Sequence, residues 1–270
     1  MEAEILGEKI PVTAIIVTYN EGNRLRDCLN SIAFCAQIIV IDLGSADDSA
    51  QIARTCGAEV YRHDWVPIVE HVLNFALSFV RNDWILRLDP DEVFPPELAA
   101  DLIPVIVQSQ GAAEIGLPFQ YYFLGKPLRT TIWGGRRMIP RMFHKDRAEI
   151  MPYVHKGFNP KRGYARIDAE PAGDYAVRHY WADSFEQLFE KHNRYLRHEG
   201  ESRYRTGQRF SWHKTVFDTL RSLGMNLIYY RGLVGGRNGI FLSFYYSWYV
   251  FMGWLSLRGY QRNLSDGRAA

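Results

Sequence analysis

The first 110 residues repeat one pattern, in which an apolar run rich in β-branched residues is followed by a polar loop and a helix signal. The first run is Val12–Thr18, and Leu25, Cys28, Leu29 and Ile32 then keep the i, i+3, i+4, i+7 spacing of a helix face. Continuous apolar runs of this kind are typical of strands buried on both faces of a parallel sheet. Strands that alternate with helices therefore predict an α/β fold, with helices on both faces of a mostly parallel, Rossmann-like sheet.

A second unit follows in the same order. Ile38–Ile41 has the composition of a strand, Ser45 and Asp48 resemble a capping box that opens a helix, and Gly57 is placed to end that helix. Ala58–Tyr61 predicts a further short strand. A third helix is predicted over residues 69–80 from the apolar residues that share one face, namely Val69, Val72, Leu73, Ala76, Leu77 and Val80.

Acidic residues are concentrated where the next predicted strand ends. Trp84–Leu88 is a mostly apolar run of strand length, and Asp89, Asp91 and Glu92 follow it, ahead of a proline pair that can open a helix. Ligands dock at the carboxyl ends of strands in open α/β sheets, and clustered carboxylates repel each other unless a cation neutralises them. Asp89 and Asp91 are therefore candidate ligands of a divalent cation, with a polar turn at a strand end as the alternative.

Composition indicates a globular protein in a reducing compartment. Of the 270 residues, 47% are hydrophobic and 23% are charged, which suits one large domain or one domain with an appendage. The cysteines, Cys28, Cys35 and Cys56, are too few and too scattered for a disulfide framework or a zinc site. The acidic start, residues 1–4, lacks the features of a secretory signal, so a cytoplasmic location is expected.

The charge of the chain shifts from acidic to basic along its length. Residues 1–110 hold 7 Lys and Arg against 17 Asp and Glu, whereas residues 191–270 hold 13 against 4. A basic C-terminal part predicts an anionic partner, either nucleic acid or a membrane surface. No nucleic-acid-binding module is recognisable there, so we expect the membrane surface and no nucleic acid.

The tail contains a long uncharged segment. A helix is predicted from Ser184, and residues 238–257 then form an aromatic run of twenty uncharged residues. Because Tyr and Trp favour the membrane interface, we expect an interfacial or re-entrant helix at 238–257, on a protein that is peripheral or monotopic at the inner face of the cell membrane. Gly239, Ser243 and Ser247 form a small-residue stripe that could pack on another helix or face headgroups. A helix buried in a soluble core or a dimer interface is the alternative.

The middle of the chain has little periodicity and many arginines. Arg136, Arg137 and Arg141 could clamp phosphate groups, and Trp133 could stack on an acceptor sugar. A solvated basic loop with an ordinary core tryptophan is the alternative. The sequence thus predicts a nucleotide-binding half, an acceptor-side half and a helical C-terminal region, at residues 1–110, 111–182 and 183–270.

Four motifs in order resemble one known family. They are Thr18-Tyr19-Asn20-Glu21, the run from Ile41 to Ser49, Asn74-Phe75-Ala76-Leu77-Ser78, and Leu88-Asp89-Pro90-Asp91-Glu92. Together they resemble family 2 glycosyltransferases of the GT-A fold, and the chain looks most similar to the bacterial lipopolysaccharide-core β-glucosyltransferase type. The resemblance covers residues 12–100 and continues more thinly through Arg141-Met142-Phe143, Val154-His155, His179-Tyr180 and the aromatic tail.

The resemblance implies roles for individual residues. Thr18, Tyr19, Asn20, Glu21 and Asp42 would hold the base and ribose of a nucleotide diphosphate sugar, for which a UDP-linked sugar is expected. Asp89 and Asp91 would hold ribose, Mg²⁺ or Mn²⁺ and pyrophosphate, with Arg136, Arg137 and Arg141 on the phosphates. Asp91 would thereby be essential for catalysis. The implied reaction is an inverting transfer of a hexose to a lipid-linked saccharide or lipopolysaccharide-core acceptor.

One position departs from the family pattern. Where relatives carry Val-His-Glu, whose glutamate is the candidate general base, this chain has Val154-His155-Lys156. An ammonium group cannot accept a proton, so the base could be His155, a deprotonated Lys156, or a carboxylate such as Glu149, Asp168 or Glu170.

Two other classes of protein remain open on the sequence. Because Lys156 replaces the expected base, the chain could be a non-catalytic binding protein of a membrane polysaccharide assembly complex. A soluble nucleotidyltransferase on a similar sheet would explain the carboxylates but not the aromatic tail.

Overall fold

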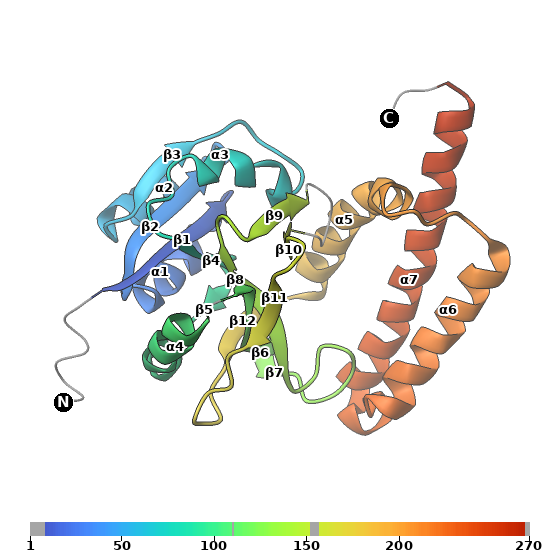
Figure 1. Cartoon of the computed structure of the whole chain (residues 1–270). Coiled ribbons are helices and arrows are strands. Elements are labelled where there is room, and N and C mark those ends of the chain that lie inside the picture. Colours follow the sequence, from blue (N-terminus) through green and yellow to red (C-terminus); the bar gives the residue numbers. More distant parts are fainter. Residues whose placement is uncertain (1–8, 110, 152–156, 268–270) are drawn as a thin grey trace. The chain divides into compact units, whose positions relative to one another are not determined.

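The structure is a computed structural model that describes residues 9–109, 111–151 and 157–267 (Figure 1). These residues form two compact units. The first, here called the sheet unit, contains the described residues of 9–120, 136–151 and 157–180. The second, the helical unit, contains residues 121–135 and 181–267.

Most strands of the described chain belong to one sheet of ten strands, whose main path runs β3-β2-β1-β4-β8-β6-β12-β5. The first four strands of this path are parallel, and β8 then runs antiparallel to both β4 and β6. Strands β7 and β11 pair with β6, and β9 and β10 form a separate antiparallel pair. The strands are β1 Ile10–Thr18, β2 Cys35–Asp42, β3 Glu59–Arg62, β4 Trp84–Leu88, β5 Glu92–Val93, β6 Ala112–Phe123, β7 Lys126–Pro127, β8 Arg136–His144, β9 Ala148–Met151, β10 Gly157–Pro160, β11 Ala165–Asp168 and β12 Val177–Ala182.

Both faces of the parallel strands are buried, as the continuous apolar runs predict. Along β1, Ala14 and Ile16 belong to one hydrophobic cluster, whereas Ile15 belongs to another on the opposite face. Helices cover each face because side chains of a strand alternate between its two sides. The first cluster includes residues of α1 Gly22–Ser31, α2 Ser49–Thr55 and α4 Pro96–Gln108, and the second includes residues of η1 Val69–His71 and α3 Leu73–Leu77 or their flanks. The predicted α/β fold is confirmed.

The second and third helices differ from their predictions. Asp48 precedes α2 without a side-chain cap, and the Ser45 hydroxyl instead accepts a hydrogen bond from the Asn20 backbone N–H. The predicted capping box is therefore wrong. The third helix is shorter than 69–80. The side-chain amide of Gln37 donates a hydrogen bond to the Phe79 carbonyl and accepts one from the Arg81 N–H, so these backbone groups are not available to a helix. These backbone groups find partners outside a helix.

Gln37→Leu is expected to lower the free energy of unfolding by about 2–4 kcal/mol. Gln37 is buried, and its side chain binds the Thr13 hydroxyl, the Phe79 carbonyl and the Arg81 N–H at 2.8, 2.9 and 2.9 Å. Leucine of similar volume cannot accept from the Thr13 hydroxyl or the Arg81 N–H, and it cannot donate to the Phe79 carbonyl. Urea unfolding measures the effect, and Gln51→Leu on the exposed side of α2 is the control, with a change within about 0.5 kcal/mol. Equal losses in both variants would contradict the role given to Gln37.

The helical unit consists mainly of three long helices and the turns between them. Its helices and turns are α5 Phe185–Arg205, α6 Trp212–Gly224, η2 Met225–Tyr229, η3 Gly232–Gly235 and α7 Gly236–Ser265. The predicted start of α5 is confirmed, because the Ser184 hydroxyl accepts a hydrogen bond from the Gln187 N–H at 3.1 Å. The uncharged segment 238–257 lies within α7. By length and composition Gly232–Ser265 could cross a membrane, since an 18-residue window within it has a mean hydropathy of 1.2, although buried core helices pass the same test.

Candidate functional site

The acidic cluster forms a tight turn between β4 and β5. The Glu92 N–H donates to the Asp89 carbonyl at 3.0 Å, and the Asp89 N–H donates back to Glu92 Oε2 at 3.0 Å. The Asp91 carbonyl accepts a hydrogen bond from the Tyr180 N–H at 2.8 Å, which ties the turn to β12. The local sequence thus places three carboxylates at the carboxyl end of β4 and holds their backbone in place.

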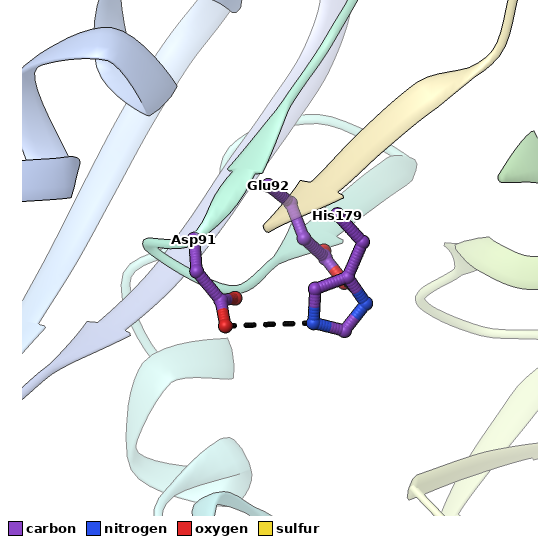
Figure 2. Close-up of side chains that lie close together, drawn as sticks. All are labelled: Asp91, Glu92 and His179. Carbon is purple, nitrogen blue, oxygen red and sulfur yellow. Dashed lines mark ion pairs between the residues drawn. The ribbon is translucent and has the colours of Figure 1, made fainter. Parts of the chain in front are cut away.

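Pairing between β5 and β12 brings His179 to the acidic turn. His179 lies opposite Glu92 in the strand register, and its ring nitrogens lie 3.5 Å from Asp91 Oδ2 and 3.4 Å from Glu92 Oε1. Figure 2 shows the Asp91 carboxylate facing the imidazole ring. All three side chains are buried, and one ligand atom from each lies within 4.8 Å of the others. Such a group could hold a metal ion.

Arg141 of β8 lies among the same carboxylates. Its Nη2 atom forms an ion pair with Glu92 Oε1 and lies 3.3 Å from Asp89 Oδ2. Burial raises the pKa of the Glu92 carboxyl, and the nearby Arg141 guanidinium opposes that rise. The guanidinium also lies over the Phe119 ring, 5.2 Å from its centroid. Arg141, which the sequence nominated for phosphate binding, therefore also balances the charge of a fully buried carboxyl.

A second arginine, the partly buried Arg87, was not among the predicted site residues. Its guanidinium lies 3.8 Å from Asp89 Oδ1 and 3.8 Å from Glu70 Oε1. Each oxygen of Asp89 therefore faces a different arginine, whereas Asp91 faces His179. A charged residue inside the apolar run of β4 was the available signal for Arg87. Glu70 and His179 reach the site from other elements. In the sequence, His179 was singled out only within the His179-Tyr180 motif of the family resemblance.

The ends of β1 and β2 are bonded to each other beside this edge of the sheet. Asn20 has a positive φ of 57°, its N–H donates to the Ser45 hydroxyl at 2.9 Å, and its side-chain oxygen accepts from the Ala46 N–H at 2.7 Å. Asp42 Oδ1 accepts from the Ser45 N–H at 3.0 Å. The residues predicted to hold the nucleotide thus lie at neighbouring carboxyl ends, with the Tyr19 side chain exposed and that of Thr18 buried.

The remaining predicted residues have other described contacts or lie outside the described chain. Arg136 Nη1 binds the Gly173 carbonyl and lies 3.4 Å from Asp174 Oδ1. Arg137 pairs with Phe119 in the register of β8 and β6. Trp133 belongs to the helical unit, where its ring centroid lies 4.4 Å from that of Trp181. His155 and Lys156 lie outside the described residues.

Comparison with known proteins gives consistent similarities. The model of the family described as glycosyl transferase family 2 matches residues 13–158. An uncharacterized glycosyltransferase of Rickettsia conorii is 30% identical over 222 residues, which cover 76% of this chain and 74% of the relative. A lipopolysaccharide core biosynthesis glycosyltransferase of Rhizobium meliloti is 24% identical over 219 residues, or 77% of either chain.

Solved structures give a weaker likeness. Glucosyl-3-phosphoglycerate synthase from Mycobacterium tuberculosis, in complex with Mn²⁺, UDP and glucosyl-3-phosphoglycerate, has a TM-score of 0.35 and 21% sequence identity. The match covers 45% of this chain and 46% of that chain, so it spans less than half of either.

Proposed function

Because the chain belongs to glycosyl transferase family 2, we propose that it moves a hexose from a nucleotide diphosphate sugar, with inversion, onto a lipid-linked saccharide or lipopolysaccharide-core acceptor. The observation that carries the proposal is the buried group of Asp91, Glu92 and His179 beside Asp89, at the carboxyl end of β4. Nucleotide ligands bind at this edge of open α/β sheets. Family membership also removes the nucleotidyltransferase alternative.

The charges of the site fit a divalent cation. The described ion pairs of the site include four carboxylates, two guanidinium groups and the His179 imidazole, so the carboxylates outnumber the guanidinium groups; the residues are Glu70, Asp89, Asp91, Glu92, Arg87, Arg141 and His179. Asp91 and His179 would hold the ion, with Glu92 beside them. Asp89 is less suited to this role, because both its oxygens already face arginines. The imidazole in the set favours Mn²⁺ over Mg²⁺.

The side chains around the turn would position the donor and stabilise the leaving group. A bound cation would neutralise charge that develops on the departing nucleoside diphosphate. Arg141 and Arg87 face the two oxygens of Asp89 and would orient its carboxylate towards a ribose hydroxyl. The bonded loops at Asn20 and Asp42 would hold the nucleoside, with Tyr19 available for stacking on the base.

The general base is a separate part of the proposal. His155 and Lys156 lie outside the described residues, and among the described alternatives the Asp168 carboxylate is ion-paired with Arg166 at 2.8 Å. If the chain has no general base, it would bind its ligands without catalysis. The second candidate function is therefore a non-catalytic binding protein of a membrane polysaccharide assembly complex. The lipopolysaccharide-core name of the Rhizobium meliloti relative supports an acceptor on a membrane and a location at its inner face.

A panel of nucleotide sugars tests the proposed activity. We expect one UDP-linked hexose, with Mn²⁺, to stabilise the protein by about 2.7 kcal/mol at a hundred times its dissociation constant, and removal of the metal by a chelator to abolish most of this effect. Thermal unfolding measures binding, and release of UDP measures turnover. Stabilisation without turnover on any acceptor would favour the binding protein. Neither stabilisation nor turnover with any nucleotide sugar would contradict both candidate functions.

A further inference from the structure

Helices α6 and α7 pack against each other through small and polar residues. The two helices lie side by side as an antiparallel pair, joined at one end by η2 and η3 (Figure 1). The Ser222 hydroxyl of α6 donates to the Ser247 hydroxyl of α7 at 3.1 Å, and Thr215 and Ser243 are fully buried. Within the small-residue stripe of α7, Ser247 therefore packs on α6, whereas Gly239 and Ser243 lie against Gly232 of η3. In a water-soluble helix pair such a contact is usually apolar.

The opposite side of α6 carries large apolar side chains that face outwards. Phe217 and Leu220 are 64% and 63% exposed, and Val216 is exposed beside them. Leu220 lies three positions after Phe217 and four after Val216, so it shares one face of the helix with both. Helix α6 thus differs from a typical helix of a water-soluble protein, since it buries the polar Thr215 and exposes several large apolar side chains.

The same pattern continues through the turn that joins the helices. Ile228, Tyr229, Leu233 and Val234 are exposed by 57% to 74%. Together with Val216, Phe217 and Leu220 they form what we call the α6-turn surface. Scattered single apolar residues are normal on a protein surface, but a contiguous group of large ones marks an interaction site.

The charge around the α6-turn surface is positive. Arg221, Arg231 and Arg237 are all exposed within or beside it. Between residues 202 and 265 the sequence contains one acidic residue, Asp218, and its carboxylate accepts a hydrogen bond from the Trp254 indole at 3.1 Å. The surface therefore combines exposed apolar side chains with uncompensated arginines.

We propose that the α6-turn surface docks on an anionic lipid bilayer, with its apolar side chains in the acyl boundary and its arginines on the headgroup phosphates. Arginine between apolar side chains suits the interface, because its long side chain can reach headgroups while its stem stays in an apolar environment. The same arginines argue against a full span, since a charge at the bilayer centre is costly. They also argue against a symmetric dimer through this surface, which would bring like charges together.

The proposed membrane contact lies on a different part of the helical unit from the segment that the sequence predicts. The sequence nominates residues 238–257, but Leu242, Tyr245 and Trp254 of that segment are buried within the structure. The large apolar side chains of that segment that are exposed, Ile240, Phe244 and Trp248, are 37% to 55% exposed, whereas those of α6 and the turn before α7 named above are 51% to 74% exposed. The inference does not require the proposed sugar transfer, because lipid docking can be measured without donor or acceptor.

Vesicle flotation of the full chain tests the proposal. Vesicles are made of phosphatidylcholine alone or with about a quarter phosphatidylglycerol. We expect the protein to float with the anionic vesicles and the double variant Phe217→Ser/Leu220→Ser to lose binding by about tenfold or more. The matched control is Tyr164→Ser/Leu264→Ser, which removes an exposed aromatic and an exposed leucine elsewhere and should change binding less than twofold or so.

Three results separate the proposal from its competitors. Arg231→Gln should reduce the preference for anionic vesicles without changing the thermal unfolding midpoint, because its side chain is exposed. Equal flotation of the Phe217→Ser/Leu220→Ser variant and the wild type would overturn the proposal, as would failure of the wild type to float at low salt. A lipid-free dimer that this double variant converts to a monomer, with flotation unchanged, would assign the surface to a second copy of the chain.

Discussion

Asp91→Asn is expected to reduce sugar transfer by about a hundredfold to a thousandfold, because it removes one negative charge from the proposed cation site while keeping the shape of the side chain. Asp91 faces His179, whereas each oxygen of Asp89 faces an arginine. Release of UDP at saturating donor measures the rate, and a titration with Mn²⁺ measures the metal affinity. The metal concentration for half-maximal activity should rise in the same variant.

The control for this variant lies at the other end of the same strand. Asp83 precedes β4, is exposed, and pairs with Lys145 at 2.9 Å. Asp83→Asn should leave both the rate and the metal titration within about twofold of the wild type, because an exposed ion pair contributes little. Transfer by Asp91→Asn at the rate of Asp83→Asn would remove Asp91 from the proposed machinery.

Arg141→Met is expected to lower the free energy of unfolding by about 3–5 kcal/mol. Glu92 is 0% exposed and paired with Arg141, so the variant leaves a buried carboxyl without its charged partner. Urea unfolding measures the loss. Adding Glu92→Gln should recover part of it, because the second change removes the buried charge.

Arg136→Met provides the matched control in the same strand. The Arg136 side chain is 40% exposed and pairs with a fully exposed Asp174, so its loss should cost no more than about 1 kcal/mol. Equal losses for Arg136→Met and Arg141→Met, or no recovery with Glu92→Gln, would show that the buried pair does not stabilise the sheet unit.

Local patterns were sufficient for most of the α/β fold. The runs at Val12–Thr18 and Ile38–Ile41 predicted β1 and β2, because β-branched and apolar residues without alternation suit a strand covered on both faces. Gly57, with a φ of 79°, follows α2 as expected, since glycine adopts this conformation without steric cost. The helix over 69–80 was predicted too long, because periodicity does not show that a distant Gln37 competes for its backbone.

The acidic turn was also visible in the sequence, but its partners were not. Asp89, Asp91 and Glu92 are neighbours along the chain, so a local pattern shows them together. His179 and Arg141 join them only through the pairing of β5 with β12 and the position of β8 in the sheet. Residue spacing contains no information on such distant pairings, which is why His179 was absent from the predicted site, whereas Arg87 was missed although it interrupts the apolar run of β4 two residues before Asp89.

The helical C-terminal part shows the same division. Composition alone predicted helices, a basic charge and an affinity for lipid, because these properties add up residue by residue. Which side of each helix faces outwards depends on packing. Ser222 meets Ser247, and this contact buries the polar side of α6 and leaves Phe217 and Leu220 exposed. The periodicity of α6 is the same for either orientation, so the side that meets the surroundings follows from the tertiary contacts and not from the order of the residues.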